Sequence, residues 1–359
     1  MKKMIPFLLG IGGLAAVTVA IANAKRHLAV VAGMAVLVAQ TNAQTLINGA
    51  GSTFDYPAFT KWFETYGQQD AGVRFNYQSI GSGGGQKQLL NQTVDFGASD
   101  APMTDEAMSK APGKILHIPV VTGGVAIIYN LPGSPKLKLD SDVLANIYLG
   151  NITKWNDPKI AALNPSVTLP DLAIVPVHRS EGSGTTYIFT DYLSSVNPAW
   201  TDTVGKSTAV RWPAGVGLGA KGSEGVAGQV KQLPGAIGYA ELAYADQNKM
   251  PYADMKNAAG NFIAPTPASV SAALATAKIP ADFRFSMVNA LGENAYPIAG
   301  ASWVIVYQQQ KDADRGKKLA AFLKWAVTDG QKISATLDYA PLPENVQSRE
   351  LELIGSIKY

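Results

Sequence analysis

One pattern recurs along this chain: a short apolar run that predicts a strand, a turn rich in Gly, Ser and Thr, and then apolar residues at helical spacing. It occurs at residues 46–66, 74–92 and 173–193, and in a weaker form at 215–233. In the first copy, Pro57 suits the first turn of a helix whose apolar side carries Phe59, Trp62 and Tyr66. Strands that alternate with helices in this way indicate an α/β fold with mostly parallel sheets.

The remaining pattern extends the same architecture towards the C-terminus. Further short strands are predicted at residues 94–98, 124–130, 236–239 and 302–307, and a last amphipathic helix at 316–327. No repeat of 20–50 residues interrupts this region. Its length is ample for two globular domains.

The N-terminal 43 residues show a different pattern of basic, apolar and small residues, which predicts a leader segment at residues 1–43. A basic start precedes an uncharged run at residues 4–22, closed by small residues up to Ala24; basic residues 25–27 then precede a second apolar stretch that ends near Ala43. This layout predicts a signal peptide with cleavage after Ala24 or Ala43. We favour Ala43, because the first predicted strand begins just after it. The alternative is that the first run, long enough to span a bilayer, stays as an anchor.

Removing the leader changes the charge and with it the expected partners. The whole chain of 359 residues has a formal charge of +3, but four bases and no acid lie in residues 1–43. The rest carries 26 Lys and Arg against 27 Asp and Glu. A body with a formal charge of −1 argues against a nucleic-acid partner.

The residue types that are absent or rare in the sequence exclude several kinds of functional site. There is no cysteine, which excludes disulfides, thiolate metal sites, cysteine nucleophiles and a lipid-anchored N-terminal Cys. Only two histidines, His117 and His178, follow the leader, and there is no HExxH cluster. We therefore predict no metal, no cofactor and a protein that is free in the periplasm.

The strand–turn–helix junctions point to an anion site. A helix N-terminus presents unpaired N–H groups and a partial positive charge, glycine lets backbone approach a ligand, and Ser or Thr adds hydroxyl donors. One such junction is weak evidence, because Ser or Thr also serves as an ordinary helix cap. The third junction also contains Arg179, whose planar guanidinium suits an oxyanion, with Glu181 nearby as a salt-bridge partner.

Asp100, just after a predicted strand, adds information about the ligand. A carboxylate in an anion pocket repels its ligand unless the ligand carries a proton that it can donate. Such a site would prefer HPO₄²⁻ or H₂PO₄⁻ to fully ionised sulfate, since an unprotonated oxygen facing a carboxylate leaves two acceptors with no hydrogen.

An enzyme is the main alternative class. A Ser183–His178–Asp100 triad can be written, but His178 and Arg179 are neighbours on one strand, so their side chains point to opposite faces. Glu181 also occupies the first position of a would-be G-x-S-x-G elbow. We predict no catalytic residues. The G-x-G-x-x-G match at residues 217–222 follows Trp212-Pro213 and not a clean apolar strand, so it is interpreted as a packing or cleft-lining loop.

With these residues the chain closely resembles the periplasmic phosphate-binding proteins of phosphate ABC transporters, the PstS type. The matching stretches occur in family order: Gly49-Ala-Gly-Ser-Thr-Phe54, Tyr77-Gln-Ser-Ile-Gly-Ser-Gly-Gly84, Thr93-Val-Asp-Phe-Gly-Ala-Ser-Asp-Ala-Pro102, Ile147-Tyr-Leu-Gly150, Lys154-Trp-Asn-Asp157, Gly182-Ser-Gly-Thr185, Leu233-Pro-Gly-Ala-Ile-Gly-Tyr239 and Asp338-Tyr-Ala-Pro-Leu-Pro343. They span nearly all of the chain after the leader.

The resemblance implies a type II periplasmic-binding fold of two lobes that close on phosphate in the cleft between them. Lobe I would comprise residues 45–120 plus 298–359, and lobe II residues 122–297. The implied phosphate contacts are Thr53, Phe54, Ser82, Asp100, Arg179, Ser183, Gly184 and Thr185. In the implied roles Asp100 accepts the phosphate proton, and Glu181 supports Arg179.

The resemblance also implies the partners, and the sequence departs from it at two positions. The protein would be a periplasmic monomer that delivers phosphate to an inner-membrane ABC permease. Glu181 stands where many members have Asp, and Gly83 where some have a second Ser. Two alternatives remain open: a receptor for another oxyanion such as sulfate, against which Asp100 argues, and a stand-alone phosphate sensor or scavenger.

Overall fold

The computed structural model describes residues 44–359, and the account below concerns them. The predictions made for the leader, namely the signal peptide, its cleavage site and the possible anchor, lie outside these residues. Within residues 44–359 no helix is both long and apolar enough to cross a bilayer.

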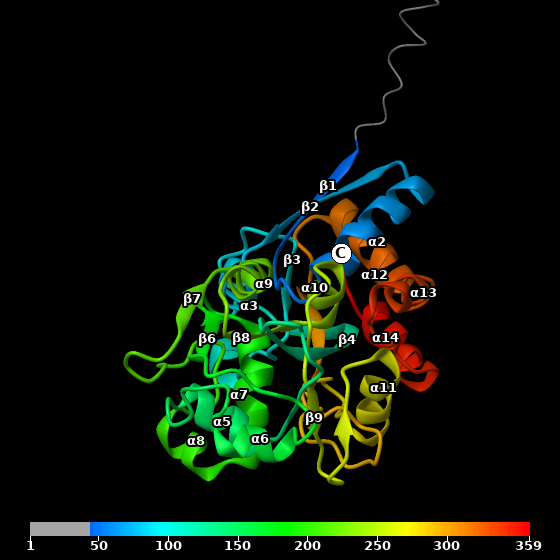
Figure 1. The fold of residues 1–359 in the computed structure, drawn as a ribbon. Coiled ribbons are helices and arrows are strands. Elements are labelled where there is room, and N and C mark those ends of the chain that lie inside the picture. The colour runs from blue at the N-terminus through cyan, green and yellow to red at the C-terminus, as the bar shows by residue number, and fades with distance from the viewer. Residues whose placement is uncertain (1–43) are drawn as a thin grey trace, which may run out of the picture. The chain divides into compact units, whose positions relative to one another are not determined.

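Strands and helices alternate along the first part of the chain, as the pattern predicts (Figure 1). The elements up to the middle of the chain are β1 (Thr45–Gly51), α2 (Tyr56–Gln69), β2 (Val73–Ser79), α3 (Ser82–Leu90), β3 (Phe96–Ser99), α4 (Asp105–Ser109), β4 (Ile115–Tyr129), β5 (Lys138–Leu139), α5 (Ser141–Tyr148), α6 (Pro158–Leu163), β6 (Val175–Arg179), α7 (Gly184–Val196) and α8 (Pro198–Thr203).

The second part continues the alternation and ends in a run of helices. Its elements are β7 (Leu218–Ala220), α9 (Gly222–Gln232), β8 (Ala236–Glu241), α10 (Leu242–Gln247), β9 (Asp254–Lys256), β10 (Phe262–Ile263), α11 (Pro267–Thr276), β11 (Ala299–Tyr307), α12 (Ala313–Ala326), α13 (Gly330–Ser334), the 3₁₀ turn η1 (Ala335–Leu337) and α14 (Glu344–Gly355).

Eight strands form one mixed sheet in the order β2-β1-β3-β11-β4-β8-β6-β7, and β10-β9-β5 form a smaller one. The predicted parallel pairing holds on both sides of the large sheet, where β1 pairs with β2 and β3, and β6 pairs with β7 and β8. The two central strands are different: β11 runs antiparallel to β3 and β4, and β4 runs antiparallel to β8. Strand direction at the centre had no signal in the apolar pattern, since apolar runs mark buried strands of either direction.

The long strand β4 joins the two sides of the sheet. Residues 115–124 of β4 pair with β11, and residues 125–129 pair with β8. All fifteen residues of β4 are buried, so the strand passes through the core from end to end. The predicted lobe crossings near residues 120–122 and 298 fall on β4 and at the start of β11. The division of the chain into lobes stays a prediction.

Helix α2 shows how the sequence produces the local packing beside the site. Pro57 lies in its first turn, and Phe59, Trp62 and Tyr66 form its buried side. The Trp62 indole Nε1 donates a hydrogen bond to the backbone oxygen of Gly330, 2.8 Å away. The Phe59 ring stands edge-on to Tyr77 of β2, with ring centroids 4.9 Å apart. This face anchors α2, whose N-terminus begins directly after the first Gly-Ser-Thr turn.

An unexpected carboxyl group lies in the core under α14. Glu350 is fully buried between Val346 and Ile354 on the face of α14 that packs on α12 and β4, and neither of its carboxylate oxygens has a hydrogen-bond partner. Burial raises its pKa well above the ordinary value for glutamate. Because an unpartnered carboxylate is costly in apolar surroundings, Glu350 stays protonated in the folded protein.

This position gives a stability prediction. Glu350→Met fills the same volume without a polar group, so we expect it to raise the free energy of unfolding by about 1–3 kcal/mol at pH 8. The gain should be smaller at pH 5. In the unfolded chain glutamate releases its proton above about pH 4.3, whereas folded Glu350 keeps it, so the stability of the unsubstituted protein falls as the pH rises towards the raised pKa. Urea unfolding at both pH values measures this, with Glu352→Met, on the exposed side of α14, as the control. Equal gains at both positions would contradict it.

Candidate anion-binding site

Hydrogen bonds connect the N-terminal ends of four helices where the Gly-rich turns end. Thr53, before α2, places its Oγ1 2.8 Å from Oγ of Ser223, in the first turn of α9. Ser82, the first residue of α3, accepts a hydrogen bond from the backbone N–H of Asp100 at 3.1 Å. Thr185, in the first turn of α7, donates to Asp100 Oδ2 at 3.2 Å. Residues that are far apart in the sequence thus form one cluster of hydroxyl and amide donors.

Arg179, at the end of β6, brings the positive charge into this cluster. Its side chain is only 1% exposed. Nε donates to Glu181 Oε1 at 2.8 Å, and Nη2 donates to the same oxygen. The other edge of the guanidinium faces Thr185 and Ser223, whose hydroxyl oxygens each lie 3.4 Å from Nη1. These last distances are at the long limit for a hydrogen bond, so this edge keeps donor capacity for an oxyanion.

Glu181 fixes the orientation of the guanidinium. Its Oε1 also accepts the backbone N–H of Gly222 at 3.1 Å, which ties the start of α9 to the Arg179 pair. The predicted pairing of Glu181 with Arg179 is present in the structure. Glutamate is longer than the aspartate of many family members, and Gly81 leaves room for it. A Cβ at position 81 would lie only 3.0 Å from Glu181 Cγ.

Asp100 brings a carboxylate into direct contact with the hydroxyl donors of the cluster. Its Oδ1 accepts hydrogen bonds from Oγ of Ser52 and, at 3.1 Å, from Oγ of Ser302, while Oδ2 faces Thr185. Burial raises the pKa of Asp100 to about 6, and the hydroxyl donors and the charge of Arg179 act in the opposite direction. At neutral pH Asp100 is therefore an ionised acceptor among donors, which is the environment in which a protonated anion binds better than an unprotonated one.

Glycine permits the close approach of the segments around the site. A Cβ on Gly184 would lie 2.5 Å from Ser82 Oγ and 2.6 Å from the backbone nitrogen of Asp100, so no other residue fits at the start of α7. Gly83 and Gly182 meet backbone to backbone: the N–H of Gly83 donates to the Gly182 oxygen at 2.9 Å. A Cβ on Gly83 would lie 3.1 Å from the Gly182 Cα.

The structure brings together the side chains that the sequence analysis selected, with two differences in detail. Ser183 uses its hydroxyl oxygen to cap α7 by accepting the N–H of Thr186 at 3.1 Å. The backbone N–H of Phe54 donates to Ser52 Oγ at 2.9 Å. The others lie in the cluster as described above. Their contacts with a ligand stay predictions.

Four polar residues of this region were not selected from the sequence: Ser52, Asp55, Ser223 and Ser302. A signal existed for Ser223, because it closes the fourth, weaker strand–turn–helix pattern, and the turn at 217–222 proves to include strand β7. Ser52 stands within the first Gly-rich turn beside Thr53. Ser302 carried no signal, since it lies inside an apolar strand and reaches the site only because β11 pairs with β3.

The would-be catalytic triad is not assembled. The His178 ring stacks on Trp212, with centroids 4.4 Å apart, and its Nδ1 lies 3.0 Å from the backbone oxygen of Arg179. The hydrogen bonds of the Asp100 carboxylate go to hydroxyl groups, and the Ser183 hydroxyl caps α7. None of these bonds involves the His178 imidazole. These contacts offer Ser183 no base.

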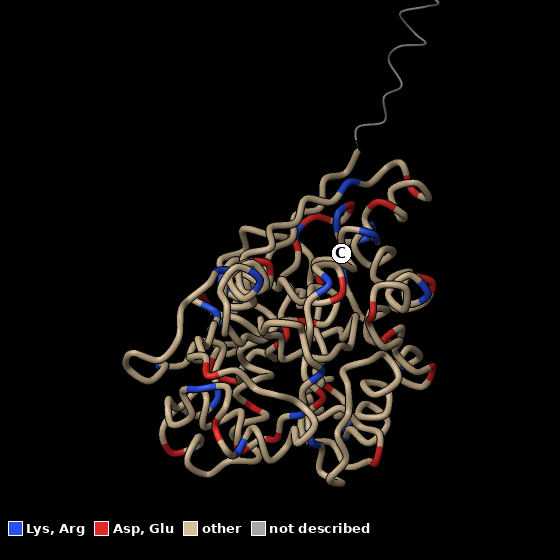
Figure 2. Tube along the Cα trace, in the orientation of Figure 1, with Lys and Arg blue, Asp and Glu red and all other residues tan. Residues whose placement is uncertain are grey.

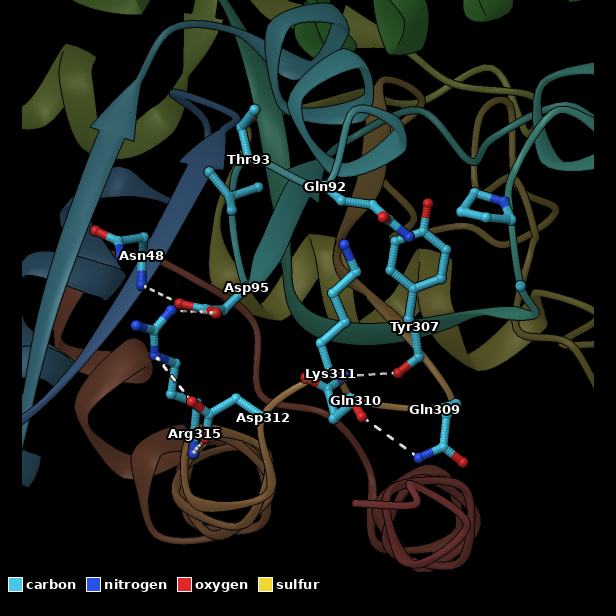
Figure 3. Close-up of a pocket in the computed structure, with 13 residues that line it drawn as sticks. Asn48, Gln92, Thr93, Asp95, Tyr307, Gln309, Gln310, Lys311, Asp312 and Arg315 are labelled. Carbon is cyan, nitrogen blue, oxygen red and sulfur yellow. Dashed lines mark hydrogen bonds and ion pairs between the residues drawn. The ribbon is translucent and has the colours of Figure 1, made fainter.

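A separate pocket of about 280 Å³ lies at the opposite ends of the first strands, near Asn48 of β1 and Asp95 before β3 (Figure 3). Two cationic residues, Lys311 and Arg315, line it. Arg315 faces two carboxylates: Nη1 lies 3.4 Å from Asp95 Oδ1, and Nε lies 3.8 Å from Asp312 Oδ2. Acceptors of this kind surround the guanidinium with negative charge. Arg315 is thus paired with carboxylates through two of its nitrogens, whereas one edge of Arg179 faces the hydroxyl groups of Thr185 and Ser223.

Charge over the described residues does not explain attraction of an anion. Figure 2 shows Lys and Arg interspersed with Asp and Glu along the chain trace, without a long stretch of either sign. Attraction must therefore come from the local donors and from Arg179.

Comparison with known proteins agrees with this architecture. The PBP superfamily domain matches residues 38–330. The phosphate-binding protein PstS of Pasteurella multocida is 44% identical over 310 residues, covering 85% of this chain and 88% of the relative. PstS of Haemophilus influenzae is 43% identical over 314 residues, covering 86% and 92%. A solved structure described as a high-affinity periplasmic phosphate-binding protein, PfluDING, bound with phosphate, has a TM-score of 0.70 and 26% identity, and covers 85% of this chain and 92% of that chain.

These likenesses extend over most of both partners, so they concern the whole fold and not one motif. They confirm the predicted α/β periplasmic-binding fold. The chain belongs to the PBP superfamily and, within it, to the family of PstS phosphate-binding proteins.

Proposed function

We propose that this protein is a non-catalytic receptor that binds inorganic phosphate at the cluster around Arg179 and Asp100. The contacts are those predicted above: Thr53, Phe54, Ser82, Asp100, Arg179, Ser183, Gly184 and Thr185, with Glu181 supporting Arg179. Ser223 joins them, because its hydroxyl lies between Thr53 and Arg179. The observation that carries the proposal is the Asp100 carboxyl group held among hydroxyl donors beside a buried guanidinium.

Binding follows from the directions of the hydrogen bonds. Serine and threonine hydroxyls and N–H groups at helix starts donate to the phosphate oxygens, and the outward edge of Arg179 adds a charge-assisted donor. Asp100 accepts the hydrogen of HPO₄²⁻ or H₂PO₄⁻. The donors that now bond to one another in the cluster exchange those bonds for bonds to the ligand, so few polar groups are left unpaired.

We further propose that the receptor works in the periplasm as a monomer and delivers phosphate to an inner-membrane ABC permease. Membership of the PstS family supports this role. Thr53, Ser82 and Asp100 come from predicted lobe I, whereas Arg179, Thr185 and Ser223 come from predicted lobe II. A ligand that contacts both sets stabilises the closed arrangement, which gives the permease a loaded state to recognise.

A receptor for another oxyanion is the alternative that the residues themselves address. Sulfate at neutral pH has no proton for Asp100, so one of its oxygens would face a carboxylate acceptor. A stand-alone phosphate sensor would use the same binding site, and it would differ from a transport receptor only in having no permease.

Calorimetry at pH 7.5 tests the proposal on purified, phosphate-stripped protein. We expect one phosphate per chain and at least about a thousandfold weaker binding of sulfate, which corresponds to about 4 kcal/mol. Equal binding of the two anions, or binding of neither, would refute the assignment. Capture of labelled phosphate by cells with and without the intact protein separates transport from sensing.

A further inference from the structure

A second buried carboxyl group, Asp55, lies directly behind Asp100. Asp55 is the N-cap residue of α2, yet its side chain makes no capping hydrogen bond and is fully buried. One hydroxyl connects the two acids: Ser302 Oγ of β11 lies 2.7 Å from Asp55 Oδ2 and 3.1 Å from Asp100 Oδ1. The proposed function uses Asp100 and gives Asp55 no role.

The two contacts of the Ser302 hydroxyl indicate that the pair of acids shares one proton. The Ser302 hydroxyl has one hydrogen and can donate it to one carboxylate at a time. If both acids were ionised, one of its two short contacts would join acceptors with no hydrogen between them, in a buried site where that is costly. A protonated Asp55 removes the conflict: its O–H donates to Ser302 Oγ, and Ser302 donates to Asp100 Oδ1.

The neighbouring donors assign this proton to Asp55 and not to Asp100. Asp100 is supplied by three hydroxyls, those of Ser52, Ser302 and Thr185, and it shares the cluster with Arg179. Asp55 has much less support. The Tyr77 hydroxyl lies 3.4 Å from Asp55 Oδ1 and donates its hydrogen to the Ser52 backbone oxygen at 2.7 Å.

The charged and titratable groups around Asp55 act in the same direction. Burial and then the charge of Asp100 raise its pKa well above the ordinary value, against its hydrogen bonds with Ser302, its own backbone and Tyr77. The phenols of Tyr244 on α10 and of Tyr339 after η1 also face this region, and Glu241 interacts with both of them. The positive charge in the network, that of Arg179, acts on Asp100.

We infer that Asp55 is a neutral carboxylic acid that, through Ser302, positions Asp100 as the acceptor for the ligand proton. The inference rests on the proposed phosphate function and goes beyond it, because it assigns a specificity role to a residue that does not touch the ligand. A single negative charge, that of Asp100, then lies next to the anion. The hydrogen-bond relay from Asp55 through Ser302 to Asp100 orients the acceptor oxygens of Asp100. Ionised Asp55 would place a second negative charge behind the first and weaken anion binding.

Infrared spectroscopy in D₂O at pH 7.5 tests the proton directly. We expect the C=O band of a protonated carboxyl in the original protein, with and without phosphate, and its loss in Asp55→Asn. Glu350→Gln is the matched control: it should remove a separate band and leave phosphate affinity unchanged. If Asp55→Asn failed to fold, Ser302→Ala should shift the Asp55 band, because the acid loses its acceptor. An unchanged carboxyl region in every site variant that folds would overturn the inference.

Phosphate affinity distinguishes a positioning role from a merely structural one. Asp55→Asn keeps a neutral donor to Ser302, so its Kd should stay within about threefold of the original, whereas Ser302→Ala should weaken binding about tenfold by cutting the relay. At least tenfold tighter binding in Asp55→Asn would mean that Asp55 is ionised and would refute the inference. If the original protein bound no phosphate at all, the proposed function would fail, while the infrared comparison would still decide the state of Asp55.

Discussion

Replacing Arg179 with Ala is expected to weaken phosphate binding by at least about a thousandfold, or roughly 4 kcal/mol. Among residues 44–359, Arg179 is the cation whose hydrogen bonds reach the hydroxyl cluster, and Glu181 holds its guanidinium in place. Truncation removes a charge-assisted donor and also leaves the Glu181 carboxylate next to the anion without its partner. Calorimetry gives the change in Kd directly.

Two further variants separate the charge of Arg179 from its shape. Arg179→Lys keeps the charge but loses the planar guanidinium, which donates to Glu181 from one edge and to a ligand from the other. We therefore expect an intermediate loss of phosphate affinity. Arg74→Ala, on an exposed position of β2, should change the affinity less than about twofold and controls for loss of net charge. An Arg179→Ala protein that folds and binds within tenfold of the original would show that the site lies elsewhere.

Replacing Asp100 with Asn is expected to reduce the preference for phosphate over sulfate by about 10- to 100-fold at pH 7.5. The carboxamide can turn its NH₂ group towards the ligand and donate, so a fully ionised sulfate no longer faces an acceptor. The ratio of the two Kd values measures this effect. The exposed Asp329→Asn is the control and should leave the ratio unchanged.

The same residue predicts how selectivity depends on pH. Because the pKa of Asp100 is raised to about 6, it accepts a ligand proton above that pH and becomes a donor itself below it. Discrimination against sulfate should therefore weaken as the pH falls from 7.5 to 5 in the original protein, and it should change less in Asp100→Asn, where only the phosphate itself titrates. A ratio that is independent of pH in both proteins would contradict the role of Asp100.

Much of this architecture could be predicted from the apolar pattern, and the failures have physical causes. Each strand–turn–helix junction is local in sequence, so its Gly, Ser and Thr residues could be recognised without knowing the fold. Arg179 and Asp100 stood out because a charge at the end of an apolar strand is unusual. Ser302 could not be found in this way, since its relevance depends on which strand lies beside β3.

Asp55 shows a second limit of local reasoning. A carboxylate just before a helix reads as an N-cap, which is the common use of aspartate at that position. Here the side chain turns instead towards Ser302, and α2 has no side-chain cap. Asp55 fits a local rule and still makes a long-range contact, which only the pairing of β11 with β3 reveals.

The backbone contact between Gly83 and Gly182 has a consequence for kinetics. These two residues lie next to Ser82 and Ser183 and connect the segments that the two predicted lobes contribute. If the lobes separate to release the ligand, this hydrogen bond between the backbones of Gly83 and Gly182 must break. The lifetime of the loaded receptor then depends on two positions that have no side chain to offer the ligand, so residence time and selectivity can change independently in this protein.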